Sequence, residues 1–225
     1  MQAASQTDQV YDQVRQAILS LDIVPGARLS ERSLEAEFGA SRTPVRAALM
    51  RLQGEGLVAR DGRAWQATPI DLDEVTALAE YREAIEAAAA RLACERASDA
   101  DLARFAESVT AQSTEPDDEH AGMRRGSDFH EGLAALSRNP FIVQAVADAV
   151  TRMARARWLE MRTEDGRAAA WDEHAEIVDA IVHRNADAAA AAIAHHTQAN
   201  LDRLLVSIRS DRRAFGARGL RIVGE

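Results

Sequence analysis

The chain has 225 residues, a hydrophobic fraction of 47% and a formal net charge of -9, which fit a globular protein with room for two small domains. Its single cysteine, Cys94, excludes a disulfide framework, and the absence of an apolar run of about 18 residues argues against a membrane span. The overall acidity argues against a protein that coats nucleic acid non-specifically. We therefore expect a cytoplasmic protein without a signal peptide.

The charge is spread unevenly along the chain. Residues 1–70 hold eight arginines and eight acidic residues, whereas residues 71–225 hold 19 arginines and 28 acidic residues. Lysine is absent, so every basic residue apart from histidine is an arginine. A neutral front and an acidic back indicate two modules with different partners.

The first elements in chain order are two helices. Apolar residues at helical spacing predict a helix over residues 7–21, and Pro25-Gly26 follows it as a turn signal. Ser30 can cap a second helix, which Gly39 ends. A short turn then leads to a third helical pattern.

The third helix and the segment after it complete a recognisable order. Ser41 can cap this helix, which we expect over residues 42–55. Asp61-Gly62 between two short apolar runs is typical of a β-hairpin. Helix, helix-turn-helix and hairpin in this order predict a winged helix-turn-helix with a small β-hairpin wing.

The back half is predicted to be all-helical. Ser98 with Asp101 three residues later resembles a capping box. A long helix is expected from Asp71 or Asp73, and further helices are expected over residues 119–137, 141–161, 168–183 and 186–209. Residues 210–225 are basic and poorly patterned, so we expect a flexible tail.

The third helix has two chemically different faces. A core stripe is expected from residues at i, i+3, i+4 and i+7, namely Val45, Ala48, Leu49 and Leu52. Thr43 and Arg46 point away from this stripe, and Arg42 lies in the first turn. Arginine pairs bidentately with guanine in a major groove, whereas the alternative is a solvated face with a few arginines.

The stretches "PGARLSER", "SRTPVRAAL" and "RLQGEGLV" follow one another within residues 8–69. This segment resembles the DNA-binding domain of GntR-superfamily transcription regulators. The resemblance implies DNA contacts from Arg32, Arg42, Thr43 and Arg46, and from the wing residues Gly62 and Arg63. The hydroxyl of Ser41 suits a phosphate oxygen. We expect Arg51 and Arg60 to be ordinary surface residues.

Three histidines of the back half lie near apolar stripes on separate expected helices. They are His130 in "SDFHEGLAAL", His174 in "WDEHAEIVDAIV" and His196 in "AAIAHHTQAN". Three imidazoles that enter one core can ligate a divalent metal. Taken singly, each is as well explained as a hydrogen-bonded core histidine.

Residues 71–209 resemble the FCD domain of FadR-like GntR regulators, through "FH…NP", "EH..IVDAI" and the spacing of the last histidine. The resemblance implies an antiparallel helical bundle whose cavity binds a small organic acid, often through a divalent metal of the zinc, nickel or manganese type. His130, His174 and His196 match metal ligands. Gly126 stands where a fourth, carboxylate ligand is expected, so a water or Asp128 could complete the site, or the site could be weak.

The sequence leaves alternative roles open for several arginines of the back half. Arg82 matches a family arginine that faces the effector, and its alternative is a salt bridge to Glu86. Arg152, Arg155 and Arg157 form a basic run on one helix, for which we expect a solvated or subunit-contact face.

Together these patterns predict a mainly α protein with a DNA-binding domain (1–69), an effector-binding and dimerisation domain (70–209) and a tail (210–225). The expected function is a ligand-responsive repressor that binds a near-palindromic double-stranded operator as a homodimer. One alternative keeps this role but has a metal-free pocket for a larger ligand such as an acyl-CoA. A more distant alternative is a metalloenzyme that uses three histidines and a water.

Overall fold

The computed structural model describes residues 5–112 and 119–224. The chain divides into two compact units. The first comprises residues 1–73 together with 211–225, and the second comprises residues 74–210. The stretch "TEPDDE" (residues 114–119), for which the sequence predicts a solvated loop, lies mostly outside the described residues.

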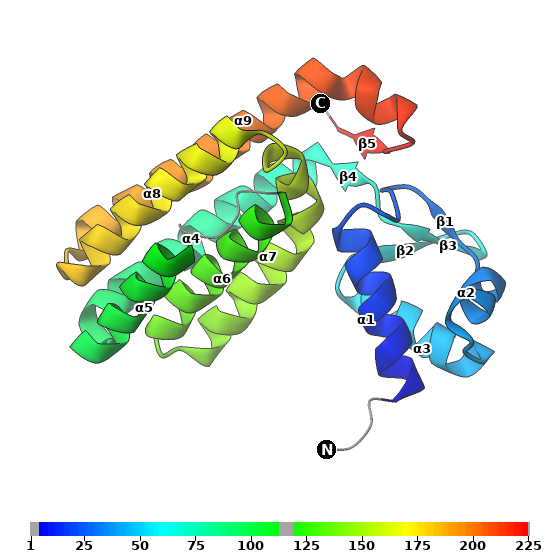
Figure 1. Ribbon diagram of the computed structural model, residues 1–225, viewed down its shortest axis with the longest axis horizontal. Helices are drawn as coiled ribbons and strands as arrows, with labels where there is room; N and C mark the ends of the chain where they lie inside the picture. Colours follow the sequence, from blue (N-terminus) through cyan, green and yellow to red (C-terminus); the bar gives the residue numbers. More distant parts are fainter. Residues whose placement is uncertain (1–4, 113–118, 225) are drawn as a thin grey trace. The chain divides into compact units, whose positions relative to one another are not determined.

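Residues 6–67 of the first unit form three helices and a small antiparallel sheet (Figure 1). The helices are α1 (Gln6–Leu19), α2 (Glu31–Phe38) and α3 (Arg42–Gly54). The sheet is formed by β1 (Arg28–Leu29), β2 (Val58–Asp61) and β3 (Ala64–Ala67), in the order β1-β3-β2. This arrangement is the predicted winged helix-turn-helix.

Local sequence signals account for the ends of these helices. The Ser30 hydroxyl accepts a hydrogen bond from the backbone N–H of Ser33, and Gly39 ends α2 in the left-handed region at a φ of 57°. The predicted stripe of α3 is confirmed, because all four of its residues are fully buried. Burial of this stripe fixes which residues of α3 face outward.

The wing is a tight hairpin. Asp61 pairs with Ala64, so Gly62 and Arg63 alone form the turn. Gly62 has a φ of 60°, and no atom lies within 4 Å of the place where its Cβ would be. Glycine suits this first turn position because a two-residue hairpin turn requires a positive φ there.

The C-terminal segment corrects our expectation of a flexible tail. Helix α9 (Ala186–Ala217) continues beyond residue 209, and β5 (Ile222–Val223) pairs in parallel with β4 (Ile70–Asp71). Phe215 is 1% exposed and Leu220 is buried. The arginine-rich composition of this segment hid the apolar residues that anchor it.

We expect Leu220→Ala to lower the free energy of unfolding by about 2–3 kcal/mol, because it removes a buried side chain from this segment. Urea denaturation of the full chain measures the change. Arg218→Ala, an exposed neighbour, is the control and should be neutral. Equal stability of the Leu220→Ala variant and the wild-type chain would show that the segment contributes no packing.

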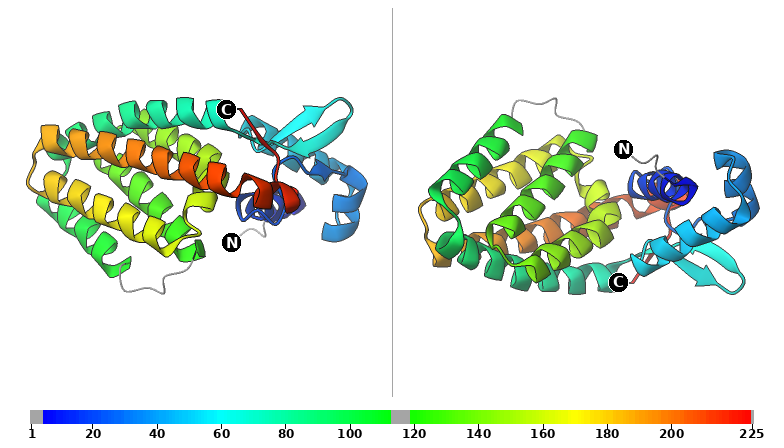
Figure 2. Two further views of the ribbon diagram at one scale, coloured as in Figure 1. Left: turned by 90° about the horizontal axis from the view of Figure 1, so that it is seen from above. Right: turned by 90° about the horizontal axis from the view of Figure 1, so that it is seen from below.

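The second unit is helical throughout its described residues. Its helices are α4 (Leu72–Arg96), α5 (Asp99–Gln112), α6 (Glu119–Leu136), α7 (Pro140–Glu160), α8 (Glu164–Val182) and most of α9. They pack side by side as a bundle in which α8 and α9 run antiparallel (Figure 2). Within the part of the chain described, no helix combines the length and hydropathy that a membrane span requires.

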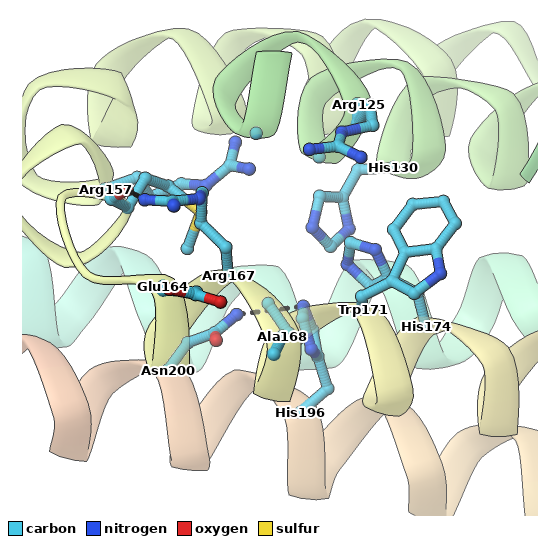
Figure 3. A pocket seen from close by; sticks show the side chains of 14 residues that line it. Arg125, His130, Arg157, Glu164, Arg167, Ala168, Trp171, His174, His196 and Asn200 are labelled. Atoms are coloured by element: carbon cyan, nitrogen blue, oxygen red, sulfur yellow. Dashed lines mark hydrogen bonds between the residues drawn. The ribbon is translucent and has the colours of Figure 1, made fainter. Parts of the chain in front are cut away.

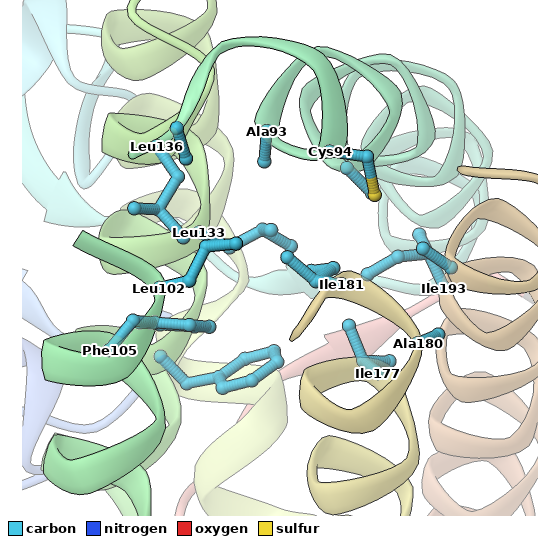
Figure 4. Packing of buried hydrophobic residues seen from close by; sticks show 14 of the residues in the cluster. Ala93, Cys94, Leu102, Phe105, Leu133, Leu136, Ile177, Ala180, Ile181 and Ile193 are labelled. Atoms are coloured by element: carbon cyan, nitrogen blue, oxygen red, sulfur yellow. The ribbon is translucent and has the colours of Figure 1, made fainter. Parts of the chain in front are cut away.

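The core of the helical unit consists of aliphatic and aromatic side chains from five helices (Figure 4). Leu133 and Ile177 are fully buried in it, and Phe105 packs against Phe129 with ring centroids 5.6 Å apart. Cys94 lies in this cluster as a small buried side chain. This apolar packing fixes the facing sides of α6, α8 and α9, on which the predicted histidines lie.

Candidate functional site

An arginine-lined groove runs over the winged helix. Its lining comes from α2, α3 and the sheet: Arg28, Leu29, Ser30, Glu31, Arg32, Glu35, Arg42, Arg46, Arg60, Arg63, Ala64 and Trp65. Six of these residues are arginines and two are glutamates. The groove is therefore a positively charged surface on a chain that is acidic overall.

Glu31 organises the arginines of α3. Arg42 Nε lies 3.0 Å from Glu31 Oε2, and Arg46 Nε lies 3.5 Å from Oε1. The carboxylate is held in turn by the Trp65 indole, whose Nε1 donates to Oε1 at 3.0 Å. These hydrogen bonds keep the pKa of Glu31 below its usual value, with the indole bond as the largest cause. Each guanidinium group thus turns its Nε towards Glu31, while both side chains remain largely exposed.

Four of the predicted DNA-contact residues line this groove, namely Arg32, Arg42, Arg46 and Arg63. Arg42 and Arg46 have side chains that are 71% and 52% exposed. Ser41 is the N-cap residue of α3 but makes no side-chain capping bond. Pro44, the third residue of α3, has no N–H to donate to it. Thr43, Arg32, Gly62 and Arg63 are also exposed, so the structure brings all seven predicted residues to the surface.

The sequence analysis missed two contributors to the groove. Arg60 lies over the Trp65 ring at 3.4 Å from its centroid, and its Nη1 donates to the Arg63 carbonyl at 3.3 Å. Arg28 approaches Asp61 at 3.9 Å. Arg60 was expected to be an ordinary surface residue, because the pairing that places it beside Trp65 is not visible in a linear pattern.

The three predicted histidines meet in the helical unit (Figure 3). His130 comes from α6, His174 from α8 and His196 from α9. All three are buried, and each offers a ring nitrogen within 4.8 Å of those of the other two. Their ring centroids are 4.6–5.3 Å apart. The spacing and burial suit three nitrogen ligands of a single ion.

Two of these imidazoles are oriented by carboxylates. His130 Nδ1 donates to Glu86 at 2.7 Å, and His196 Nδ1 donates to Glu173 at 2.8 Å. Arg203 holds Glu173 through two hydrogen bonds of 2.6 and 3.0 Å. A carboxylate on one ring nitrogen directs the other nitrogen towards a metal in known sites. The sequence analysis named Glu86 only as a salt-bridge partner of Arg82 and did not single out Glu173.

His174 has a different environment. Its ring stacks on Phe129 at a centroid distance of 3.8 Å, and neither ring nitrogen has a hydrogen-bond partner among the described residues. Burial holds the pKa of His174 well below its ordinary value, and the pKa values of His130 and His196 are also lowered, chiefly by burial. All three imidazoles are therefore neutral near pH 7, which is the form that binds metal.

Arg82 adopts the second of its two predicted alternatives. It is 1% exposed, and its Nε donates to Glu86 at 2.8 Å. Its Nη2 lies 3.0 Å from His130 Nε2. Arg82 is not among the residues that line the neighbouring cavity. In this structure it contacts His130 and does not face the space where an effector would bind.

A cavity of about 220 Å³ adjoins the histidine cluster (Figure 3). It is lined by Gly122, Arg125, Gly126, His130, Arg157, Met161, Glu164, Arg167, Ala168, Ala170, Trp171, His174, His196 and Asn200. Asp128 is exposed and does not join the cluster, so it does not replace the missing ligand at Gly126.

The basic run on α7 corrects another expectation. Arg155 and Arg157 are buried, and only Arg152 of the three lies on the surface. All residues from 153 to 157 are buried, so this part of α7 is covered on several sides. The closeness of these arginines in the sequence indicated a solvated face, and it did not predict the burial of Arg155 and Arg157.

A winged helix followed by a separate helical unit is an architecture used by transcriptional regulators. The family model "Bacterial regulatory proteins, gntR family" matches residues 6–65, and the model "FCD domain" matches residues 77–199. The chain therefore belongs to the gntR family of bacterial regulatory proteins and carries an FCD domain. Members of this family are transcriptional regulators, not enzymes, as predicted.

Individual relatives agree with this assignment. The "Nta operon transcriptional regulator" of Aminobacter aminovorans is 32% identical over 82% of this chain and 88% of its own length. The "HTH-type transcriptional repressor RspR" of Escherichia coli K12 is 24% identical over 84% of this chain and 85% of its own. A solved GntR regulator from Rhodococcus sp. RHA1 shares the fold, with a TM-score of 0.75, 24% identity, and coverage of 90% of this chain and 98% of that one.

Proposed function

We propose that this protein is a cytoplasmic repressor that binds a near-palindromic DNA operator as a homodimer and responds to a small organic acid. The observation that carries this proposal is the exposure of Arg42 and Arg46 at the start of α3, where both pair with Glu31. Two copies of α3 would enter successive major grooves about one helical turn apart. The acid would act by binding one arrangement of the winged helices better than the other.

The groove supports DNA binding through its chemistry. Arg42 and Arg46 present their guanidinium groups to solvent, where each can pair bidentately with a guanine. Ser41, Thr43 and Arg32 are exposed beside them and suit phosphate oxygens. Arg63 and Gly62 at the wing tip would follow the backbone or the minor groove.

The histidine cluster fits a divalent metal of the zinc, nickel or manganese type. His174 carries two buried ring nitrogens without a partner among the described residues, and such nitrogens are costly unless a ligand satisfies them. His130 and His196 are already oriented by Glu86 and Glu173. When bound, the metal would supply positive charge that attracts a carboxylate. Arg82 would hold Glu86, the carboxylate that orients His130, and its Nη2 would have to move away from His130 Nε2 to free that nitrogen for the metal.

The size of the cavity favours a small acid over an acyl-CoA. A volume of about 220 Å³ lies below the range of roughly 300–1,000 Å³ that drug-sized ligands occupy. The alternative with a metal-free pocket for a larger ligand has less support than a small carboxylate at the three histidines.

A gel-shift series with DNA from upstream of the protein's own gene tests the DNA-binding role. We expect a sequence-selective shift that weakens steeply with salt and survives competition by unrelated DNA. If specific and unrelated fragments compete equally at every salt concentration, the protein does not read sequence.

Glu31→Gln is expected to weaken operator binding about three- to tenfold, because it loosens the orientation of Arg42 and Arg46. Removal of a negative charge should strengthen binding to unrelated DNA at the same time. Fluorescence anisotropy with both DNAs measures the ratio of affinities. Glu37→Gln, an exposed position on the same helix, is the matched control. An unchanged ratio in Glu31→Gln would contradict the positioning role.

A further inference from the structure

Two glycines of α6 admit two arginines to the cavity. A Cβ on Gly126 would lie 2.1 Å from Nη2 of Arg157, and a Cβ on Gly122 would lie 2.9 Å from Cδ of Arg167. The glycines are one helical turn apart and both line the cavity. Glycine inside a helix costs about 1 kcal/mol relative to alanine, and here it creates the space that the two arginines fill.

The guanidinium of Arg157 is buried without full compensation. Its Nη1 has no hydrogen-bond partner in the described parts of the chain, and the side chain is 5% exposed. Burial, together with the positive charge of Arg82, lowers the pKa of Arg157 to about 10, so the group stays charged at neutral pH. A buried cation with an open donor calls for an anion.

The cavity as a whole carries excess positive charge. Arg125, Arg157 and Arg167 line it, and Glu164 is the acidic residue among the lining residues. The three histidines of the cluster add no negative charge. Figure 3 shows Arg157 and Arg167 set apart from the three imidazole rings. A ligand that reached both places would need an anionic group at each of them.

We propose that Arg157, for which Gly126 leaves room, makes this cavity selective for an acid with two or more carboxylates. One carboxylate lies at the histidine cluster and a second pairs with Arg157. This inference rests on the proposed binding of a small organic acid. It adds that Arg157 is the cationic anchor for a second carboxylate of the effector.

Isothermal titration calorimetry of the full chain with butanoate and succinate, with and without zinc, tests this inference. Both acids have four carbons, and succinate carries one more carboxylate. Wild-type protein should bind succinate roughly tenfold to a hundredfold more tightly, as a hydrogen-bonded ion pair contributes. Arg157→Met should remove most of this preference and leave butanoate binding unchanged.

Two further variants keep the test decisive. Gly126→Ala retains the charge of Arg157 but displaces its guanidinium, which is the flexible end of a side chain, so it should also lower the succinate preference. Arg152→Met removes an exposed arginine from the same helix and should preserve the preference. Equal affinities of the wild-type protein for succinate and butanoate, or an unchanged ratio of these affinities in Arg157→Met, would overturn the inferred selectivity but not the proposed effector role. Failure of both acids to bind with or without zinc would instead contradict the proposed effector role.

Discussion

Replacement of both Arg42 and Arg46 with alanine is expected to abolish selective operator binding. Each bidentate contact with guanine contributes about 1–3 kcal/mol of discrimination, and a dimer would lose two contacts per subunit. Additive losses predict a fall in operator affinity of more than a thousandfold, to the level of unrelated DNA. Fluorescence anisotropy at fixed salt with operator and unrelated DNA measures both affinities.

The fold should tolerate this change, because both side chains are largely exposed and their ion pairs with Glu31 lie at the surface. The unfolding temperature of the double variant should therefore match that of wild type. Arg51→Ala removes one positive charge from the same helix outside the groove, and it should retain selective binding. Selective binding by the double variant would show that other residues read the operator.

Replacement of His174 with leucine is expected to have opposite effects on the metal-free and metal-loaded protein. In the metal-free protein it removes an imidazole whose two buried nitrogens have no partner among the residues that the structure describes, and it should raise the free energy of unfolding by about 1–3 kcal/mol. In wild type, zinc at about 100 times its dissociation constant should stabilise by about 2.7 kcal/mol, and His174→Leu should lose this stabilisation.

Urea denaturation of chelator-treated protein, with and without added zinc, measures both effects. His195→Leu is the matched control, since His195 is an exposed neighbour of His196 on α9. It should leave the response to zinc intact. An undiminished response to zinc in His174→Leu would exclude this histidine as a ligand.

The sequence predicted most of the winged helix because its signals are local. Ser30, Gly39 and the apolar stripe of α3 each act within a few residues, and burial confirms the stripe. The three histidines could be placed together because each lies on the apolar side of its own helix. Spacing alone left each candidate residue open to a structural role, and the resemblance to GntR and FCD domains supplied the assignment to DNA and metal.

The remaining features depend on contacts between distant residues. Glu31 meets Trp65 across 34 positions, and His130 meets Glu86 across 44. The place of Arg157 beside Gly126 depends on how α6 packs on α7, which no spacing within either helix encodes. Likewise, the arginines of the last residues concealed the pairing of β5 with β4. Such tertiary contacts can be identified only once the fold is known.

Helix α9 contributes His196 to the cluster in one unit, and its last turns, with Phe215, belong to the other. We expect occupancy of the histidine cavity to change the affinity of the arginine groove for DNA. The most direct test is the operator dissociation constant measured by anisotropy with neither ligand, with zinc, and with zinc plus succinate. We expect a change of about 5- to 150-fold on addition of zinc and succinate. If both ligands bind by calorimetry and the operator dissociation constant stays the same, the histidine cavity does not regulate DNA binding.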